Sequence, residues 1–289
     1  GIARRHPLTH TPWVSCYLPG LFALIHASSY LRVVAPPPHA AFVHGESGMD
    51  GAELPAPSTP VDGTDAVAFI IETCRATEGI WLVPTGPLTN IALAIRRAPD
   101  LVERVAGISL MGGGSFGNRT AVAEFNVWAD PHAAAVVFDA FDPATDGPTP
   151  AGPLVMAGLD VTHRFQVTAE RIAATRSVGN TVGTVLADLF DFFSGTYLER
   201  HDDGALAGAA LHDPLAVLAV SHPELFESGD RHVVVETEGQ RTAGMTVIDE
   251  RHLIERSAPN CRVLTDVDDD AAFAVILDAI ANQPGSDPN

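Results

Sequence analysis

The chain contains no lysine, so all 17 of its basic residues are arginine. They are outnumbered by 36 acidic residues, which give a formal net charge of −19 and an isoelectric point near 4.8. Because nucleic-acid backbones bind to basic surfaces, this imbalance argues against a protein that binds DNA or RNA. We therefore expect no nucleic-acid partner and a small-molecule ligand instead.

Cysteine is also scarce. The three cysteines, Cys16, Cys74 and Cys261, are widely spaced and form no C-x-x-C pair. This spacing argues against a disulfide framework or a zinc site and favours a reducing compartment.

No uninterrupted apolar run is long enough to span a membrane. Residues 13–35 are apolar and follow Arg4 and Arg5, as in a secretory signal, but Pro19-Gly20 interrupts them. A membrane helix needs ~20 consecutive apolar residues, and the interrupted run is a poor signal peptide. We expect a cytoplasmic protein without a membrane partner.

What is present is the composition of a globular domain, with 46% hydrophobic residues and a mean hydropathy of +0.14. Residues 1–40 show no clear period, whereas strand and helix patterns alternate after residue 42. We expect one domain over residues 41–283, an unmatched and irregular segment over 1–40, and a polar tail over 284–289. Alternating strands and helices imply a single α/β domain with a mostly parallel open sheet flanked by helices.

The expected elements follow from apolar periodicity and capping residues. Thr89 or Asn90 is expected to cap a helix, and Asp130-Pro131 and Asp213-Pro214 are typical helix starts. The expected strands are 80–83, 105–111, 154–157, 232–236, 245–248 and 262–265, and the main helices are 65–77, 91–97, 181–199 and 268–281. Ligands in such folds bind beyond the carboxyl ends of strands, which draws attention to residues 84–90, 111–126 and 158–163.

Four motifs occur in order along the chain. They are Val43-His-Gly-Glu-Ser-Gly48, Val83-Pro-Thr-Gly-Pro-Leu-Thr-Asn90, Met111-Gly-Gly with Gly117-Asn118 and Ala123-Glu-Phe-Asn126, and Leu211-His-Asp-Pro214. Together they resemble nucleoside hydrolases of the inosine/uridine-preferring type, and the resemblance continues to the C-terminal helix. The resemblance implies calcium-assisted hydrolysis of ribonucleosides to ribose and free base, and a dimer or tetramer. It leaves the preference for purine or pyrimidine open.

The resemblance also assigns roles to side chains. Breaking an N-glycosidic bond builds positive charge on the ribose, so such an enzyme must grip the sugar hydroxyls. By resemblance, Asn118, Glu124 and Asn126 bind those hydroxyls and Met111 lines the sugar pocket. Taken alone, Asn118 could equally be a turn residue and Glu124 a solvated surface charge.

Three further residues are implied at the metal and at the leaving base. By resemblance, Asp213 and the backbone carbonyl of Thr85 are calcium ligands, a donor type that calcium prefers, and His212 is a candidate proton donor to the base. Taken alone, Asp213 could be a helix N-cap before Pro214. His44 lies in a loop near the implied pocket and is expected to be a hydrogen-bonded loop histidine.

One expected motif is missing. Members of the family begin with a strand that ends in D-x-D-P-G-x-D-D, whereas no aspartate precedes Asp50 here. Because those carboxylates supply most of the calcium ligands and the base for water, we expect low calcium occupancy and little hydrolase activity from this sequence. The alternative function is a non-catalytic, nucleoside-binding or degenerate remnant.

Two other motifs point to different sites and are set aside. Asp266-Val-Asp-Asp-Asp270 is acidic, but it lies where a strand passes into a helix, so helix capping accounts for it. Gly112 to Gly117 matches G-x-G-x-x-G, which could suggest a nicotinamide-dependent oxidoreductase. No apolar helix opens directly after it, so a dinucleotide site is not expected.

Overall fold

The computed structural model describes residues 17–18, 21–24, 51–52, 63–199, 207–252 and 255–283. Its centre is a seven-stranded sheet with the order β1-β2-β3-β4-β5-β11-β8. The strands from β2 to β11 run parallel, and β1 and β8 pair antiparallel at the two edges. This confirms the expected mostly parallel sheet. The strands of this sheet are β1 (Tyr17–Leu18), β2 (Leu21–Leu24), β3 (Trp81–Leu82), β4 (Gly107–Met111), β5 (Leu154–Ala157), β8 (Phe226–Arg231) and β11 (Cys261–Val267).

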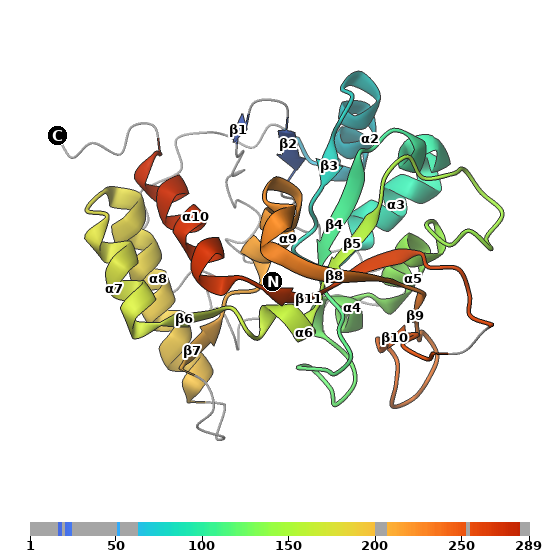
Figure 1. Cartoon of the computed structure of the whole chain (residues 1–289). Helices are drawn as coiled ribbons and strands as arrows, with labels where there is room; N and C mark the ends of the chain where they lie inside the picture. The colour runs from blue at the N-terminus through green and yellow to red at the C-terminus, as the bar shows by residue number, and fades with distance from the viewer. Residues whose placement is uncertain are drawn as a thin grey trace, which may run out of the picture.

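Helices cover both faces of the sheet (Figure 1). One face packs against α2 (Ala66–Ala76), α3 (Thr89–Arg97), η2 (Pro99–Glu103) and α5 (Pro131–Asp139). The other packs against α6 (Leu159–Thr162), α9 (Asp213–Ser221) and α10 (Asp269–Ala281). The remaining elements are α4 (Phe125–Ala129), β6 (Gln166–Thr168), α7 (Ala169–Ser177), α8 (Thr181–Leu198), β7 (Gly208–Ala210), η3 (Pro223–Leu225), β9 (Val233–Val235) and β10 (Thr246–Ile248).

Strand β4 shows why the central strands are apolar throughout. Ile108 and Leu110 point into one helical layer, whereas Met111 points into the other. Successive side chains of a strand alternate between faces, so a sheet covered on both faces needs apolar residues at nearly every position. Ser109 is the polar exception in this strand, and its buried hydroxyl donates to the Ala216 carbonyl oxygen of α9 at 2.7 Å.

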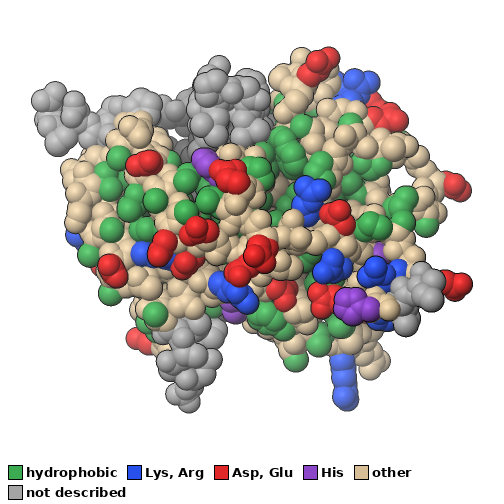
Figure 2. All heavy atoms as spheres, in the orientation of Figure 1, with side chains coloured by type: hydrophobic (Ala, Val, Ile, Leu, Met, Phe, Trp, Pro, Cys, Tyr) green, Lys and Arg blue, Asp and Glu red, His purple; other side chains and the backbone are tan. Residues whose placement is uncertain are grey.

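Two smaller sheets extend the domain. Strands β9 and β10, which lie within two of the expected strand ranges, pair antiparallel, and β9 packs against α5. Strands β6 and β7 also pair antiparallel, and α7 and α8 lie beside them at the left of Figure 1. On the face that Figure 2 shows, acidic side chains and arginines are interspersed. No helix among the residues described could cross a membrane, since none is both long and apolar enough.

The structure corrects two local predictions. Leu21–Leu24 forms β2 and pairs in parallel with β3, although no element was expected in residues 1–40. A parallel strand can be a short apolar run with no alternation, so periodicity does not reveal it. Thr89 and Asn90 do not cap α3, because the N-cap is Leu88 and both residues lie inside the helix. The Thr89 hydroxyl donates instead to the Asp130 carboxylate at 2.7 Å.

Candidate active site

The loops that follow β3, β4 and β5 are joined by backbone hydrogen bonds. Met111 N donates to the Pro84 carbonyl oxygen at 2.9 Å, and Leu159 N donates to that of Gly113 at 2.9 Å. Gly113 has a φ of 73°, a conformation that L side chains rarely adopt. The three loops therefore form one connected surface at the carboxyl ends of the parallel strands, where ligands bind in this architecture.

Glu124 holds the start of α4 against this surface. Its carboxylate is only 2% exposed and accepts hydrogen bonds from Asn126 N at 2.8 Å and from Val127 N and Gly113 N at 3.0 Å each. The side chain is thus a helix N-cap. The interpretation of Glu124 as a solvated surface charge is wrong, because the carboxylate is buried and bound to backbone amides.

Asn126 joins two of the predicted site residues. Its side-chain Nδ2 donates to the Met111 carbonyl oxygen at 3.1 Å and contacts the Thr85 carbonyl oxygen at 3.4 Å. It also lies 3.3 Å from the Met111 sulfur. Thr85, Met111 and Asn126 are therefore neighbours, although they come from the loop after β3, the end of β4 and the start of α4.

Asn118 lies at the rim of the same region. The residue is exposed, and its Oδ1 accepts a hydrogen bond from Phe125 N at 2.9 Å. This bond ties the loop 112–122 to the first residue of α4. The amide NH2 group of Asn118 is the part of the side chain that this contact leaves for a ligand.

Asp213 is the first residue of α9, and the N-cap is His212, which makes no side-chain capping bond. The interpretation of Asp213 as an N-cap is therefore wrong. Asp213 has exposed surface, yet the protein surrounds it deeply enough that desolvation raises the pKa of its carboxyl to about 7, and the charge of Glu124 adds to the increase. Desolvation also raises the pKa of Glu124 to about 6, against the lowering effect of its backbone hydrogen bonds. Asp213 and Glu124 thus form one pair of interacting carboxyls.

His212 lies beside the C-terminal end of α6. Its Nδ1 is 2.7 Å from the hydroxyl oxygen of Thr162, a residue that is fully buried. Its ring centroid is 5.5 Å from that of His163, which in turn makes an edge contact with Phe116 at 5.3 Å. Sequence reasoning placed residues 158–163 near the site but did not identify Thr162.

Two other supporting residues were also missed. Thr246 of β10 donates its hydroxyl to the Gly114 carbonyl oxygen at 2.7 Å and accepts from Gly114 N at 2.9 Å. The Asp160 carboxylate accepts from Ser115 N at 2.8 Å and from the Ser115 hydroxyl. Both contacts fix the glycine-rich loop after β4, and neither could be found from spacing, since the partners are 45 or more residues apart.

The two motifs set aside in the sequence behave as expected. Asp268 caps α10 by accepting from Ala271 N at 3.1 Å, and Asp269 and Asp270 both pair with Arg171. No helix opens directly after Gly117, because α4 begins only at Phe125.

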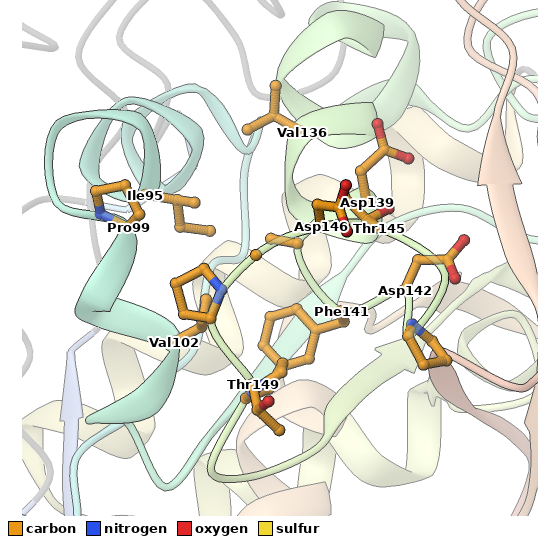
Figure 3. A pocket seen from close by; sticks show the side chains of 15 residues that line it. Ile95, Pro99, Val102, Val136, Asp139, Phe141, Asp142, Thr145, Asp146 and Thr149 are labelled. Atoms are coloured by element: carbon orange, nitrogen blue, oxygen red, sulfur yellow. The ribbon is translucent and has the colours of Figure 1, made fainter.

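A separate hollow lies in the helical layer that contains α3 and α5. It has a volume of about 440 Å³ and lies between α3, η2, α5 and the loop 141–150 (Figure 3). Apolar side chains such as Ile95, Val102 and Phe141 line it together with three aspartates, and it shares no residue with the predicted site.

The described residues offer few metal ligands. Within the parts of the chain that the structure describes, no group of three or more His, Cys, Asp or Glu side chains could hold a metal ion. Asp213 and the Thr85 carbonyl oxygen have the donor chemistry that calcium prefers, and the carboxyl pair of Asp213 and Glu124 would be stabilised by a nearby cation. The donors therefore fit calcium in kind but fall short in number. His44 lies outside the described residues.

Comparison with known proteins identifies relatives over most of the chain. Residues 19–274 match the family model of inosine-uridine preferring nucleoside hydrolases. The match therefore begins within residues 1–40, where the sequence shows no motif of the family. The chain is 42% identical over 242 residues to the pyrimidine-specific ribonucleoside hydrolase RihA of Escherichia coli O9:H4 (strain HS). That alignment covers 82% of this chain and 73% of the relative.

Solved structures show the same similarity. The purine-preferring ribonucleoside hydrolase from Gardnerella vaginalis superposes with a TM-score of 0.73 at 30% identity, covering 90% of this chain and 79% of that one. An inosine-guanosine nucleoside hydrolase superposes with a TM-score of 0.71 at 26% identity, covering 86% and 78% of the two chains.

Proposed function

The chain belongs to the inosine-uridine preferring nucleoside hydrolase family, and on that premise we propose that it hydrolyses the N-glycosidic bond of ribonucleosides, releasing ribose and a free base. The observation that carries the proposal is the contact of Asn126 with both Met111 and Thr85, beside the Asp213 and Glu124 pair. These residues come from separate elements, the loop after β3, the end of β4 and the starts of α4 and α9. This architecture binds ligands at the carboxyl ends of the strands.

We propose that Asn118 and Asn126 bind the ribose hydroxyls directly and that Met111 packs against the sugar. Each Asn side chain has both donor and acceptor groups, which suits vicinal hydroxyls. Glu124 accepts three backbone hydrogen bonds, so its carboxylate retains limited capacity for a substrate hydroxyl. Its larger contribution is to hold Asn126 and Gly113 in place.

We propose calcium as the cation of this site, with Asp213 and the Thr85 carbonyl as its ligands. When bound, calcium would anchor ribose hydroxyls and lower the pKa of a water molecule. Because calcium takes about 6–8 ligands and these residues supply two oxygens, we expect weak binding and activity that rises with calcium concentration. Asp213 would bind calcium in its deprotonated form, so binding should strengthen as the pH rises through about 7.

We propose that His212 serves the departing base as a hydrogen-bond or proton donor. Negative charge develops on the base as the bond to ribose breaks, and a donor placed at that charge lowers the barrier. The position of His212 at the start of α9, next to Asp213, supports this role.

We propose pyrimidine ribonucleosides as the first substrates to test. The relatives named pyrimidine-specific are 42% identical to this chain, whereas the solved hydrolase named purine-preferring is 30% identical. The solution state is proposed to be a dimer or tetramer in the cytoplasm. Light scattering with size-exclusion chromatography would test the oligomer.

The experiment that tests the function measures ribose release from uridine, cytidine and inosine over a range of calcium concentrations. Asn126→Ala should lower kcat/KM at least ~10-fold, as expected for loss of substrate-positioning contacts. The matched control Asn282→Ala, at the C-cap of α10, should not. Absence of turnover at every calcium concentration, together with absence of nucleoside binding by calorimetry, would overturn the proposal.

One specific feature favours a second candidate function. No aspartate precedes residue 50, so the carboxylates that the family uses to activate water are not matched there. A protein that binds nucleosides without hydrolysing them would show binding of uridine in calorimetry and no ribose release. The same pair of measurements therefore separates the two functions.

A further inference from the structure

Two backbone hydrogen bonds, at Leu211 and at His212 itself, fix the position of the His212 backbone. Leu211 N donates to the Phe165 carbonyl oxygen at 2.8 Å, and the His212 carbonyl oxygen accepts from Leu215 N at 3.2 Å. These bonds fix the entry into α9 next to the short helix α6. Thr162, the last residue of α6, is fixed in turn by its N–H, which donates to the Gly158 carbonyl oxygen at 3.0 Å.

The side chains of these two residues meet at short distance. The Thr162 hydroxyl oxygen lies 2.7 Å from His212 Nδ1, and Thr162 has no exposed surface. A buried hydroxyl that leaves its hydrogen without an acceptor costs about 1–3 kcal/mol. Among the residues described, His212 Nδ1 is the acceptor that the structure offers to this hydroxyl.

The direction of the hydrogen bond follows from that cost. Thr162 donates and Nδ1 accepts, so Nδ1 carries no proton. In the neutral imidazole the single ring proton is then on Nε2, since one nitrogen donates and the other accepts.

We propose that Thr162 is a positioning residue that holds His212 as the Nε2–H tautomer and orients this N–H toward the departing base. The proposal rests on the proposed function for the identity of the base. As the bond from C1′ to the base nitrogen breaks, its electron pair leaves with the base. The Nε2–H group donates a hydrogen bond to the negative charge that develops there, and its proton stays on Nε2. Hydroxide from water adds to C1′, and the proton released from that water neutralises the departed base anion.

The ring has a second neighbour that restricts its rotation. The His163 ring is tilted by 52° against the His212 ring at 5.5 Å between centroids, and Phe116 makes an edge contact with His163 at 5.3 Å. His212 thus contacts both the His163 ring and the Thr162 hydroxyl. The hydroxyl selects the tautomer, and the packing restricts the plane of the ring.

The first test needs no variant and no activity. ¹⁵N NMR of histidine-labelled full-length protein at pH 8, where an ordinary imidazole is neutral, should show His212 Nδ1 as an unprotonated, hydrogen-bonded nitrogen. His212→Gln assigns the signal. A protonated Nδ1 would overturn the proposal whether or not the protein hydrolyses nucleosides.

The second test compares substrates that differ in their need for help at the leaving group. Thr162→Val should lower kcat on uridine about 10-fold, as expected for loss of about one hydrogen bond, with little change in KM. It should barely affect 4-nitrophenyl riboside, whose leaving group departs as a stable anion without a donor. Thr162→Ser should restore uridine turnover, because serine keeps the hydroxyl.

A matched control separates positioning from general destabilisation. Thr175 is also fully buried and donates its hydroxyl to the Arg171 carbonyl oxygen at 2.9 Å, away from the site. Thr175→Val should change turnover of both substrates equally or not at all. If Thr162→Val lowers turnover of uridine and of 4-nitrophenyl riboside equally, the proposal is overturned. If the wild type turns over neither substrate, the result counts against the proposed function, and the NMR measurement alone decides the tautomer.

Discussion

Replacing Asp213 with Asn should stabilise the protein in the absence of calcium, although it removes a residue that the proposed function requires. The carboxyl has an ordinary pKa of 3.8, which desolvation and the charge of Glu124 raise to about 7. The folded state therefore holds the proton more tightly than the unfolded chain does. The contribution of this carboxyl to the free energy of unfolding is fully present below its ordinary pKa, and it is lost as the pH rises to about 7.

The size of the effect follows from the two pKa values. One pKa unit corresponds to about 1.4 kcal/mol, so a group wholly removed from water would cost about 4 kcal/mol above pH 7. Asp213 has exposed surface, and solvent screens its charge, so we expect about 1–2 kcal/mol at pH 8. At pH 5 the gain from Asp213→Asn should be less than half of that.

The assay is urea unfolding with EDTA at pH 5 and pH 8. Asp278→Asn on the exposed side of α10 is the matched control and should change stability by less than ~0.5 kcal/mol, as is usual for surface positions. At pH 8, added calcium should stabilise the wild type and leave Asp213→Asn unchanged. If Asp213→Asn is no more stable than the wild type at pH 8, or its gain does not depend on pH, the assigned environment of Asp213 is wrong.

Three further substitutions test the rest of the site. Glu124→Gln should lower the free energy of unfolding, measured by heat or urea, by about 1–3 kcal/mol. The NH2 group of the glutamine would face the backbone N–H groups of Gly113 and Val127, which need an acceptor. Unchanged stability would count against the capping role. Gly113→Ala should lower the free energy of unfolding by about 2 kcal/mol or more, because φ is 73° and the new Cβ would lie 2.9 Å from a methionine sulfur. In the control Gly147→Ala the new Cβ has open space around it, so stability should hardly change. Asn126→Ala should reduce uridine binding in calorimetry about 10-fold or more and should cost about 1 kcal/mol of stability, as is typical for the loss of one hydrogen bond. Undiminished binding would remove Asn126 from the sugar site.

Local patterns were sufficient for most central elements. Asp65 was expected at the start of a helix and caps α2 by accepting from Ala68 N at 2.9 Å. Asp130-Pro131 opens α5 in the same way, because the carboxylate accepts from Ala133 N and proline needs no hydrogen-bond partner in the first turn. The apolar run Leu154–Ala157 matches β5 at both ends. In each case the signal lies within a few residues of the element that it predicts.

Elements that depend on a distant partner were missed or misread. Strand β8 has the polar sequence Phe226–Arg231 and is a strand because it pairs with the edge of β11. Leu21–Leu24 is a strand because β3 offers a parallel edge. Thr89 looked like a cap because threonine often is one, but the hydroxyl has a better acceptor in Asp130, 41 residues away.

The same distinction between local sequence signals and distant contacts holds for the candidate site. The sequence by itself determined which chemical groups are present, since the motifs around Asn118, Glu124, Asn126, His212 and Asp213 carry the family resemblance. Only the tertiary structure decided what each group can do. In the folded protein the Glu124 carboxylate is buried and accepts three backbone hydrogen bonds, and Asp213 lies close enough for the two charges to interact. The Thr162 hydroxyl contacts His212, although the two residues are 50 positions apart in the sequence. The physical reason is that pKa, tautomer and hydrogen-bond capacity depend on what surrounds a side chain in space, and residues distant in the sequence supply those surroundings.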